Sequence, residues 1–151
     1  MGKLFVQKFG GTSVATTERI EEVADIIIED IKTGNQVVAV LSAMGNQTEE
    51  LIKLAKKIDP NANPREYDAL VSTGEQISVA LLAIALEKKG FLSKSYSAYQ
   101  LGIKTNDLHK QARILDVDVK RLEEDIKSGI IPVVTGFQGM NVVGDITTLG
   151  R

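Results

Sequence analysis

Short apolar runs alternate along the chain with longer segments whose apolar residues recur every three or four positions. Leu4–Phe9 reads as a short strand, and Ile130–Thr135 as a buried strand. Val37–Leu41 is a continuous apolar run, as expected of a strand buried on both faces of a sheet. The segment Glu18–Lys32 places its apolar residues on one helical face and has glutamates in or near its first turn. Strands that alternate with helices in this way predict a three-layer α/β/α fold with a mostly parallel sheet.

The remaining elements are less regular. We predict helices over Thr48–Ile58, Tyr67–Lys89 and around Val119–Ile126, and weaker strands over Ser95–Tyr99 and Leu115–Val117. The helix Tyr67–Lys89 is apolar on nearly all sides in its second half, so we expect it to be central and buried. Asn46, followed three residues later by Glu49, fits a capping box at the start of the Thr48–Ile58 helix.

Length and composition favour one globular domain. The 151 residues are 43% hydrophobic and 25% charged, which is enough to bury a core. Eighteen basic against twenty acidic residues give a net charge of −2, without the basic clusters of nucleic-acid binders or a stretch long enough to cross a membrane. With no cysteine and only one histidine, thiolate and histidine-rich metal sites are excluded. We therefore expect a soluble, cytoplasmic protein that binds neither nucleic acid nor membranes.

Three glycine- or serine-containing turns follow predicted strands. They are Gly10–Ser13, Ser42–Thr48 and Gly136–Gly139. Ligands of open parallel sheets bind beyond the carboxyl ends of the strands. The sequence therefore predicts a ligand site at this edge of the sheet.

The first of these turns has the chemistry of a phosphate site. Gly10 and Gly11 allow backbone N–H groups to approach an anion closely, Thr12 and Ser13 add hydroxyl groups, and Lys8 adds a positive charge at the strand end. The order of residues is neither that of a Walker A loop nor that of a dinucleotide-binding fingerprint. A tight strand-to-helix turn with an exposed lysine would explain the same residues equally well.

The run from Lys8 to Val14 resembles the opening signature of aspartate kinases, within the amino acid kinase family. Five further segments resemble motifs of that family in the same order: Val38–Gly45, Ser72–Glu75, Lys104–Asp107, Gly136–Gly139 and Thr147–Arg151. Together they span nearly the whole chain, which makes the resemblance far more specific than any one motif.

The resemblance implies ATP-dependent phosphorylation of the side-chain carboxylate of L-aspartate to 4-phospho-L-aspartate, the first step toward lysine, threonine and methionine. ATP and Mg²⁺ are then expected ligands. Lys8 would stabilise the transferring phosphoryl group, with help from the amides of Gly10 and Gly11. Because the acceptor carboxylate is already ionised at neutral pH, it needs no general base.

Four residues are expected to hold the acceptor. Glu75, an isolated acid at the start of an apolar helix, would bind the ammonium group, although it could also simply favour the helix N-terminus. Arg151 would pair with the α-carboxylate. Ser42 and Thr48 offer hydroxyl groups, but both residue types are also common in turns and helix starts. The single histidine, His109, is expected to be a solvated loop residue.

After Arg151, an aspartate kinase would continue with a nucleotide lobe and regulatory ACT modules. Residues 1–151 are therefore interpreted as the acceptor-binding part of a catalytic domain, incomplete at its C-terminal side and inactive by itself. An unpaired apolar edge strand would favour a homo-oligomer. Two alternatives stay open: another amino acid kinase with acetylglutamate or glutamate as acceptor, and a non-catalytic module that binds aspartate or phosphate.

Overall fold

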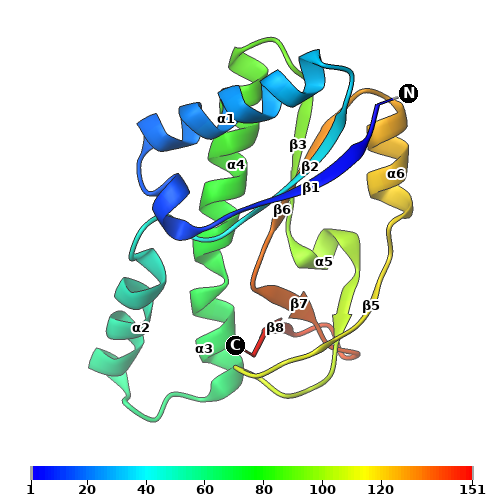
Figure 1. The fold of residues 1–151 in the computed structure, drawn as a ribbon. Helices are drawn as coiled ribbons and strands as arrows, with labels where there is room; N and C mark the ends of the chain where they lie inside the picture. Colours follow the sequence, from blue (N-terminus) through cyan, green and yellow to red (C-terminus); the bar gives the residue numbers. More distant parts are fainter. Residues whose placement is uncertain (1, 151) are drawn as a thin grey trace.

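A parallel four-stranded sheet forms the centre of the computed structural model, which describes residues 2–150 (Figure 1). Its strands are β1 (Leu4–Phe9), β2 (Gln36–Leu41), β6 (Ile131–Thr135) and β3 (Ser93–Tyr96), side by side in the order β1-β2-β6-β3. The first three confirm the predicted strands to within one residue. The fourth begins two residues before the prediction and ends three residues earlier.

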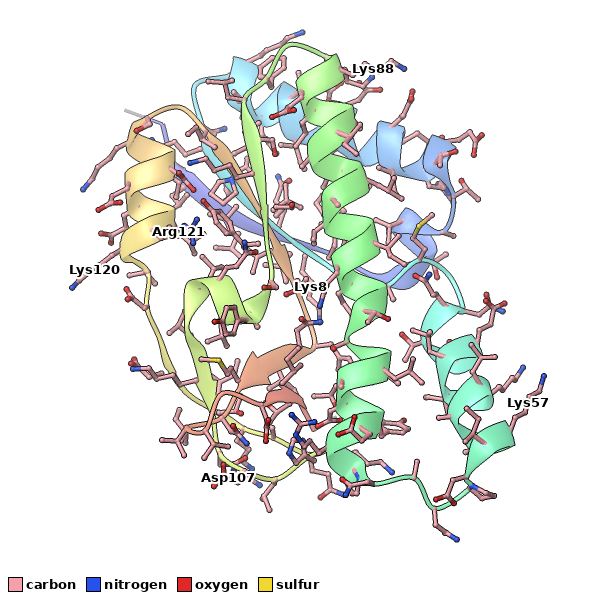
Figure 2. The ribbon with its side chains drawn as sticks, turned by 180° about the vertical axis from the view of Figure 1, so that it is seen from behind. Lys8, Lys57, Lys88, Asp107, Lys120 and Arg121 are labelled. Carbon is pink, nitrogen blue, oxygen red and sulfur yellow. The ribbon has the colours of Figure 1, made fainter. Side chains whose placement is uncertain are left out.

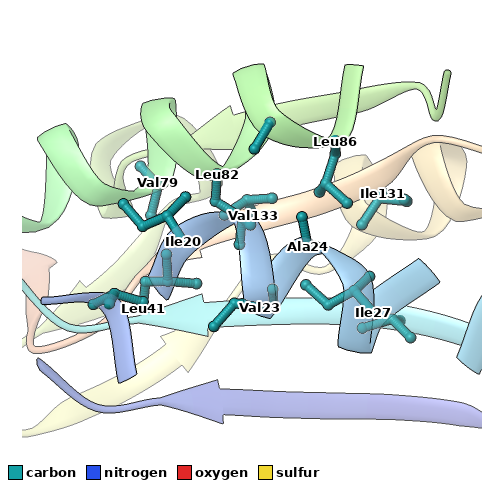
Figure 3. Packing of buried hydrophobic residues seen from close by; sticks show 14 of the residues in the cluster. Ile20, Val23, Ala24, Ile27, Leu41, Val79, Leu82, Leu86, Ile131 and Val133 are labelled. Atoms are coloured by element: carbon teal, nitrogen blue, oxygen red, sulfur yellow. The ribbon is translucent and has the colours of Figure 1, made fainter. Parts of the chain in front are cut away.

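One face of this sheet is covered by α1 (Thr17–Lys32) and α4 (Thr73–Lys88), and the main core lies between them and the strands (Figure 3). Leu82 and Leu86 of α4 and Val133 of β6 are buried in this core. Alternate residues of β2 point into the same core, and the others point to the opposite face. This two-sided burial explains why β2 and β6 read as continuous apolar runs.

The opposite face is covered by α6 (Lys120–Lys127) and the short helix α5 (Ala98–Leu101). A second, smaller apolar cluster lies there, formed by Val38, Tyr96, Leu101 and Val134 with Leu122 and Ile126 of α6 packed against it. Helices on both faces of a parallel sheet make the three layers that the sequence predicted.

A second sheet lies beyond the carboxyl end of β6 (Figure 1) and was not predicted. It contains β5 (Ile114–Val117), β4 (Ile103–Thr105), β7 (Gln138–Met140) and β8 (Ile146–Thr148), in the order β5-β4-β7-β8. β4 and β7 are parallel, whereas the other two pairs are antiparallel. Strands of three or four residues carry almost no periodic signal, and only the β5 region was expected to be extended.

The predicted helix Tyr67–Lys89 is two helices, α3 (Pro64–Val71) and α4, separated at Ser72. The Ser72 hydroxyl donates to the Ala69 carbonyl at 3.0 Å, and the Thr73 hydroxyl donates to the Leu70 carbonyl at 2.7 Å. Such bonds compete with the regular helical pattern. The prediction of one continuous helix was therefore wrong at this junction.

The α4 helix is central and largely buried, as predicted, but one side is open to solvent, because Ile77 is 43% and Ile84 62% exposed. The 25-residue stretch Pro64–Lys88 is long and apolar enough to cross a membrane by length and composition alone, contrary to the sequence prediction. Just over half of its apolar window is buried inside the protein, as in a core helix.

Side-chain caps begin three of the helices, but not the one for which a capping box was predicted. Thr16, Asn63 and Ser97 each accept a hydrogen bond from a backbone N–H of α1, α3 and α5 respectively. Asn46 precedes α2 (Gln47–Ile58) without accepting such a bond, so the predicted capping box does not form.

Replacing Leu82 with alanine tests this packing. Leu82 is 0% exposed between α1, α4 and the sheet, so Leu82→Ala should lower the free energy of unfolding by about 2–5 kcal/mol. Ile84→Ala is the matched control on the same helix and should cost less than about 1 kcal/mol, because Ile84 is largely exposed. Urea denaturation followed by circular dichroism measures both, and equal losses would contradict the core described here.

Candidate active site at the carboxyl ends of the strands

The three turns predicted to form a site meet at the carboxyl ends of β1, β2 and β6. The Gly45 N–H donates to the Gly11 carbonyl at 3.0 Å, which joins the first two turns. The Gly136 N–H donates to the Leu41 carbonyl at 2.9 Å, which joins the third turn to β2. The predicted convergence is therefore confirmed.

These turns enclose an open cavity of about 450 Å³. It is lined by Lys8, Gly11, Ser42, Ala43, Gly45, Thr48, Glu49, Glu75, Phe137, Leu149 and Gly150. Five of the predicted site residues are in this lining, one of them cationic and one acidic. Gly10, Thr12 and Ser13 are not in the lining, and Arg151 lies outside the described residues.

Lys8 is the last residue but one of β1 and has an exposed side chain (Figure 2). Within residues 2–150 its ammonium group has no acidic partner within ion-pair distance. A lysine whose charge is not neutralised by the protein can interact with an anionic ligand in the cavity.

Gly11 is a glycine because a second loop approaches it closely. It opens a single turn of 3₁₀ helix, η1 (Gly11–Val14). A Cβ atom added to Gly11 would lie 3.0 Å from the carbonyl oxygens of both Ala43 and Gly45. A side chain at this position would crowd the loop after β2, which packs closely against the end of β1.

Glu75 lies at the start of α4 and is only 2% exposed. Burial raises the pKa of its carboxyl group to about 7, although the backbone N–H groups of Glu75 and Ala43 and the Gln138 amide partly offset this by hydrogen bonding to it. Within residues 2–150 no lysine, arginine or histidine forms an ion pair with it. This is an acid that would gain from a cationic ligand.

Gln138, which was not predicted as a site residue, helps to hold Glu75. Its side chain is buried at the start of β7, and its Nε2 donates to the Ser72 carbonyl at 2.9 Å and to Glu75 Oε2 at 3.3 Å. The two partners lie 66 and 63 residues away in sequence. No local pattern signals contacts over such distances.

Phe137 and Glu49 also line the cavity and were not predicted as site residues. Phe137 has a φ of 68°, a left-handed conformation that is uncommon for residues other than glycine and that often occurs at functional sites. Its carbonyl accepts the Leu149 N–H at 2.8 Å, which ties the turn after β6 to the end of β8. Glu49, interpreted as a cap partner, instead brings a second carboxylate to the cavity.

A larger groove of about 780 Å³ adjoins the cavity and shares Thr48, Phe137, Leu149 and Gly150 with it. Lys110 and Arg113 give this groove a positive character. The Lys110 ammonium lies 4.4 Å from the centre of the Tyr67 ring, within the range of a cation–π interaction.

His109 is not the solvated loop residue that was predicted. Its side chain is 16% exposed, and its Nδ1 lies 2.8 Å from Oδ2 of the fully buried Asp68. The partner lies 41 positions earlier in the chain, so the polar sequence around His109 gives no sign of it.

Residues 2–150 contain no group of three or more histidine, cysteine, aspartate or glutamate side chains placed to hold a metal ion. We therefore assign no Mg²⁺ ligand to the described residues.

Comparison with known proteins shows the family. The amino acid kinase family matches residues 3–151, and the chain belongs to that family. Aspartokinase from Geobacillus stearothermophilus is 50% identical over 148 residues, and aspartokinase 2 from Bacillus subtilis (strain 168) is 48% identical over the same length. Each match covers 98% of this chain, which spans only 36% of the length of either relative.

Solved structures of aspartate kinases have the same fold. An aspartate kinase from Synechocystis superposes with a TM-score of 0.80 at 44% identity, over 98% of this chain and 24% of that one. Aspartokinase III from E. coli, in complex with aspartate and ADP, has a TM-score of 0.85 at 23% identity, over 100% of this chain and 44% of that one. The predicted family and fold class are therefore confirmed.

The raised pKa of Glu75 predicts a pH-dependent stability. The folded protein holds a proton on Glu75 up to about pH 7, whereas the unfolded chain loses it near the ordinary value of 4.5. The stabilisation from this proton is therefore present below pH 4.5 and is lost as the pH rises through 7. It amounts to about 3 kcal/mol, at about 1.4 kcal/mol per pH unit.

Glu75→Gln should remove this dependence. The free energy of unfolding of the variant, relative to the unmodified chain, should increase by about 3 kcal/mol between pH 4.5 and 8. Glu87→Gln, an exposed glutamate on the same helix, is the control and should show no such trend. Urea denaturation across this pH range measures both, and a constant difference for Glu75→Gln would contradict the burial of an uncompensated carboxylate.

Proposed function

We propose that this chain is the acceptor-binding part of an aspartate kinase, which transfers the γ-phosphoryl group of ATP to the side-chain carboxylate of L-aspartate. The relatives named above support this, since they are aspartokinases over 98% of the chain. The E. coli enzyme of the same fold binds aspartate and ADP. We propose the same two ligands for this family member, with Mg²⁺ accompanying the nucleotide.

The observation that carries the proposal is the pairing of Glu75 and Lys8 in one cavity. Glu75 is a buried acid with no cation beside it in the described chain, and Lys8 is an exposed cation with no acidic partner there. A zwitterionic amino acid can place its ammonium group on Glu75 and a carboxylate toward Lys8. Ser42 and Thr48 supply hydroxyl groups to the same cavity.

In the proposed reaction, an oxygen of the aspartate side-chain carboxylate forms a bond to the γ-phosphorus, and the bond from that phosphorus to the β–γ bridging oxygen breaks. The products are 4-phospho-L-aspartate and ADP. No proton has to be removed from the acceptor, so the cavity needs no general base. Lys8 lies where it could stabilise the negative charge on the transferring group. Arg151, outside the described residues, is proposed for the α-carboxylate.

Glu75 also discriminates between acceptors. N-acetylglutamate has no ammonium group, so it would leave a buried carboxylate without a cationic partner. Glutamate has the ammonium group and differs from aspartate by one methylene. We therefore propose aspartate over acetylglutamate on charge, with only a modest preference over glutamate from the size of the cavity.

We further propose that chain beyond residue 151 supplies the nucleotide lobe, since this chain is little more than a third of its relatives' length. The outer edge of β1 has no strand beside it among the described residues, and Leu4 and Val6 on β1 are exposed. Such an edge pairs readily with further chain or with another copy. The isolated chain is proposed to be inactive, and its compartment to be the cytoplasm, where ATP is available.

Activity is best tested in a chimera, in which this chain is followed by the part of the Geobacillus relative that lies after the matched segment. The chimera should form aspartyl phosphate, trapped as the hydroxamate, while the isolated chain should form none. Lys8→Ala should lower kcat by a factor of about 10²–10³, because it removes charge stabilisation from the transition state. Lys57→Ala, at an exposed lysine on α2, is the control (Figure 2). A Lys8→Ala chimera whose kcat equals that of the unsubstituted chimera would contradict the assigned role.

The affinity for aspartate should depend on the ionisation of Glu75. If the ammonium group binds only the ionised form, affinity should rise about tenfold from pH 6 to pH 8, because the pKa of Glu75 is about 7. Calorimetric titration of the chimera with aspartate at each pH measures this. The Glu75→Gln chimera should bind weakly at every pH, and a rise with pH that persists in it would assign the dependence to another group.

A further inference from the structure

Asp68 is a fully buried carboxylate that the proposed reaction does not use. It lies in α3 with 0% exposure and accepts four hydrogen bonds. Its Oδ1 accepts the Thr148 hydroxyl at 2.6 Å. Its Oδ2 accepts the Thr148 N–H at 3.0 Å, the Lys110 N–H at 3.0 Å and a bond from His109 Nδ1 at 2.8 Å.

The hydrogen-bond donors to Asp68 show which two segments of the chain it joins to α3. Thr148 is the last residue of β8, directly before Leu149 and Gly150 in the cavity wall. His109 and Lys110 belong to the loop that borders the adjoining groove. The same two segments are joined by backbone bonds of 3.0 Å, from the Ala112 N–H to the Thr148 carbonyl and from the Gly150 N–H to the Ala112 carbonyl. Asp68 therefore joins α3 to two paired segments, residues 109–112 and 148–150, of which Leu149 and Gly150 form a wall of the cavity.

Lys110, in the first of these paired segments, has a backbone conformation that is unfavourable for residues other than glycine. Its φ is 67°, in the left-handed region that side chains other than glycine seldom adopt. Its N–H is one of the four donors to Asp68. Conformations of this kind persist when surrounding contacts fix them, and the bond to Asp68 is such a contact.

The arrangement also determines which ring nitrogen of His109 donates to the carboxylate. Oδ2 of Asp68 already accepts two backbone N–H groups, so it acts as an acceptor. The Nδ1 of His109 must therefore carry the proton in this contact. The side chain of His109 is thereby oriented by the same carboxylate that holds β8.

We propose that Asp68 is a positioning residue for the phosphoryl acceptor: it holds Leu149 and Gly150 at the distance from Glu75 that L-aspartate requires. The inference rests on the proposed function. Asp68 does not line the cavity itself, so it acts through the wall and makes no contact with the substrate. The effect of losing it should therefore fall on acceptor binding and leave nucleotide binding unchanged.

The test is the steady-state kinetics of Asp68→Ala in the chimera. The KM for aspartate should rise at least about tenfold, because small displacements of positioning groups have large effects. The KM for ATP should change by less than about twofold. Asp68→Asn should restore the KM for aspartate to within about threefold, since its amide oxygen can take the place of Oδ2 and its NH₂ can donate to the Thr148 hydroxyl.

Thr148→Val provides a test if Asp68→Ala does not fold. The substitution is nearly isosteric and removes only the hydroxyl that donates to Oδ1 of Asp68. It should therefore also raise the KM for aspartate, but by a smaller factor than Asp68→Ala. Asp125→Ala is the matched control. Asp125 is another buried aspartate, which binds Lys94 and Tyr96 and joins α6 to β3 away from the cavity. It should lower the melting temperature without changing the KM for aspartate.

An active chimera in which Asp68→Ala, or Thr148→Val in its place, leaves the KM for aspartate unchanged would overturn the inference. Equal increases for aspartate and ATP, or an increase matched by Asp125→Ala, would overturn it too, because general destabilisation would then explain the result. A chimera that phosphorylates no acceptor without any substitution would instead overturn the proposed function, and this inference with it.

Discussion

Ala43 is packed between Gly11 and Gly74, and this packing places the end of β1 and the start of α4 against the same loop. A Cβ atom on Gly11 would lie 3.0 Å from the Ala43 carbonyl oxygen, and one on Gly74 would lie 2.8 Å from the Ala43 Cβ. The loop after β2 therefore fits between the end of β1 and the start of α4 only because neither neighbour has a side chain. As a result Lys8, at the end of β1, and Glu75, next to Gly74, face one cavity.

The two buried carboxylates of α3 and α4 have different environments, and the difference separates their roles. Asp68 accepts four hydrogen bonds, so its charge is well compensated within the protein. Glu75 has fewer donors, and burial raises its pKa to about 7. A carboxylate whose ionised form is poorly compensated is stabilised by any cation that enters the cavity, whereas a compensated one gains little. Glu75 is therefore suited to binding a ligand and Asp68 to holding the protein together.

The sequence predicted those parts of the molecule that depend on local patterns. The strand β1, the helix α1 and the three turns at the sheet edge follow from apolar runs, helical periodicity and glycine positions. Lys8 and Glu75 could be identified because a charged residue stands out beside glycines or in an apolar helix. The second sheet could not, because its strands are short and its pairing is set by distant chain.

The site residues that the sequence did not predict were missed for the same physical reason. Gln138 contacts Glu75 across 63 residues, and Asp68 contacts Thr148 across 80. Asp68 lies in a helix with polar neighbours, so its sequence resembles that of a solvated helix face. Only the fold shows that this position is covered by β8 and the loop around His109. Long-range polar contacts of this kind have no period, and a single sequence does not reveal them.

The position of the cavity between two sheets explains why these polar contacts matter. The parallel sheet supplies Lys8 and the loop with Ser42, whereas β8 of the second sheet leads into Leu149 and Gly150. Within a sheet, ladder hydrogen bonds fix the spacing of neighbours, but among residues 2–150 no strand of one sheet pairs with a strand of the other. Long-range side-chain contacts add to the chain connections between them: Asp68 of α3 binds Thr148 of β8, and Gln138 of β7 binds Ser72 and Glu75. A small change in these contacts would move one wall of the cavity against the other while leaving the strand pairing within both sheets intact, so the shape of the cavity depends more on Asp68 and Gln138 than the two sheets do.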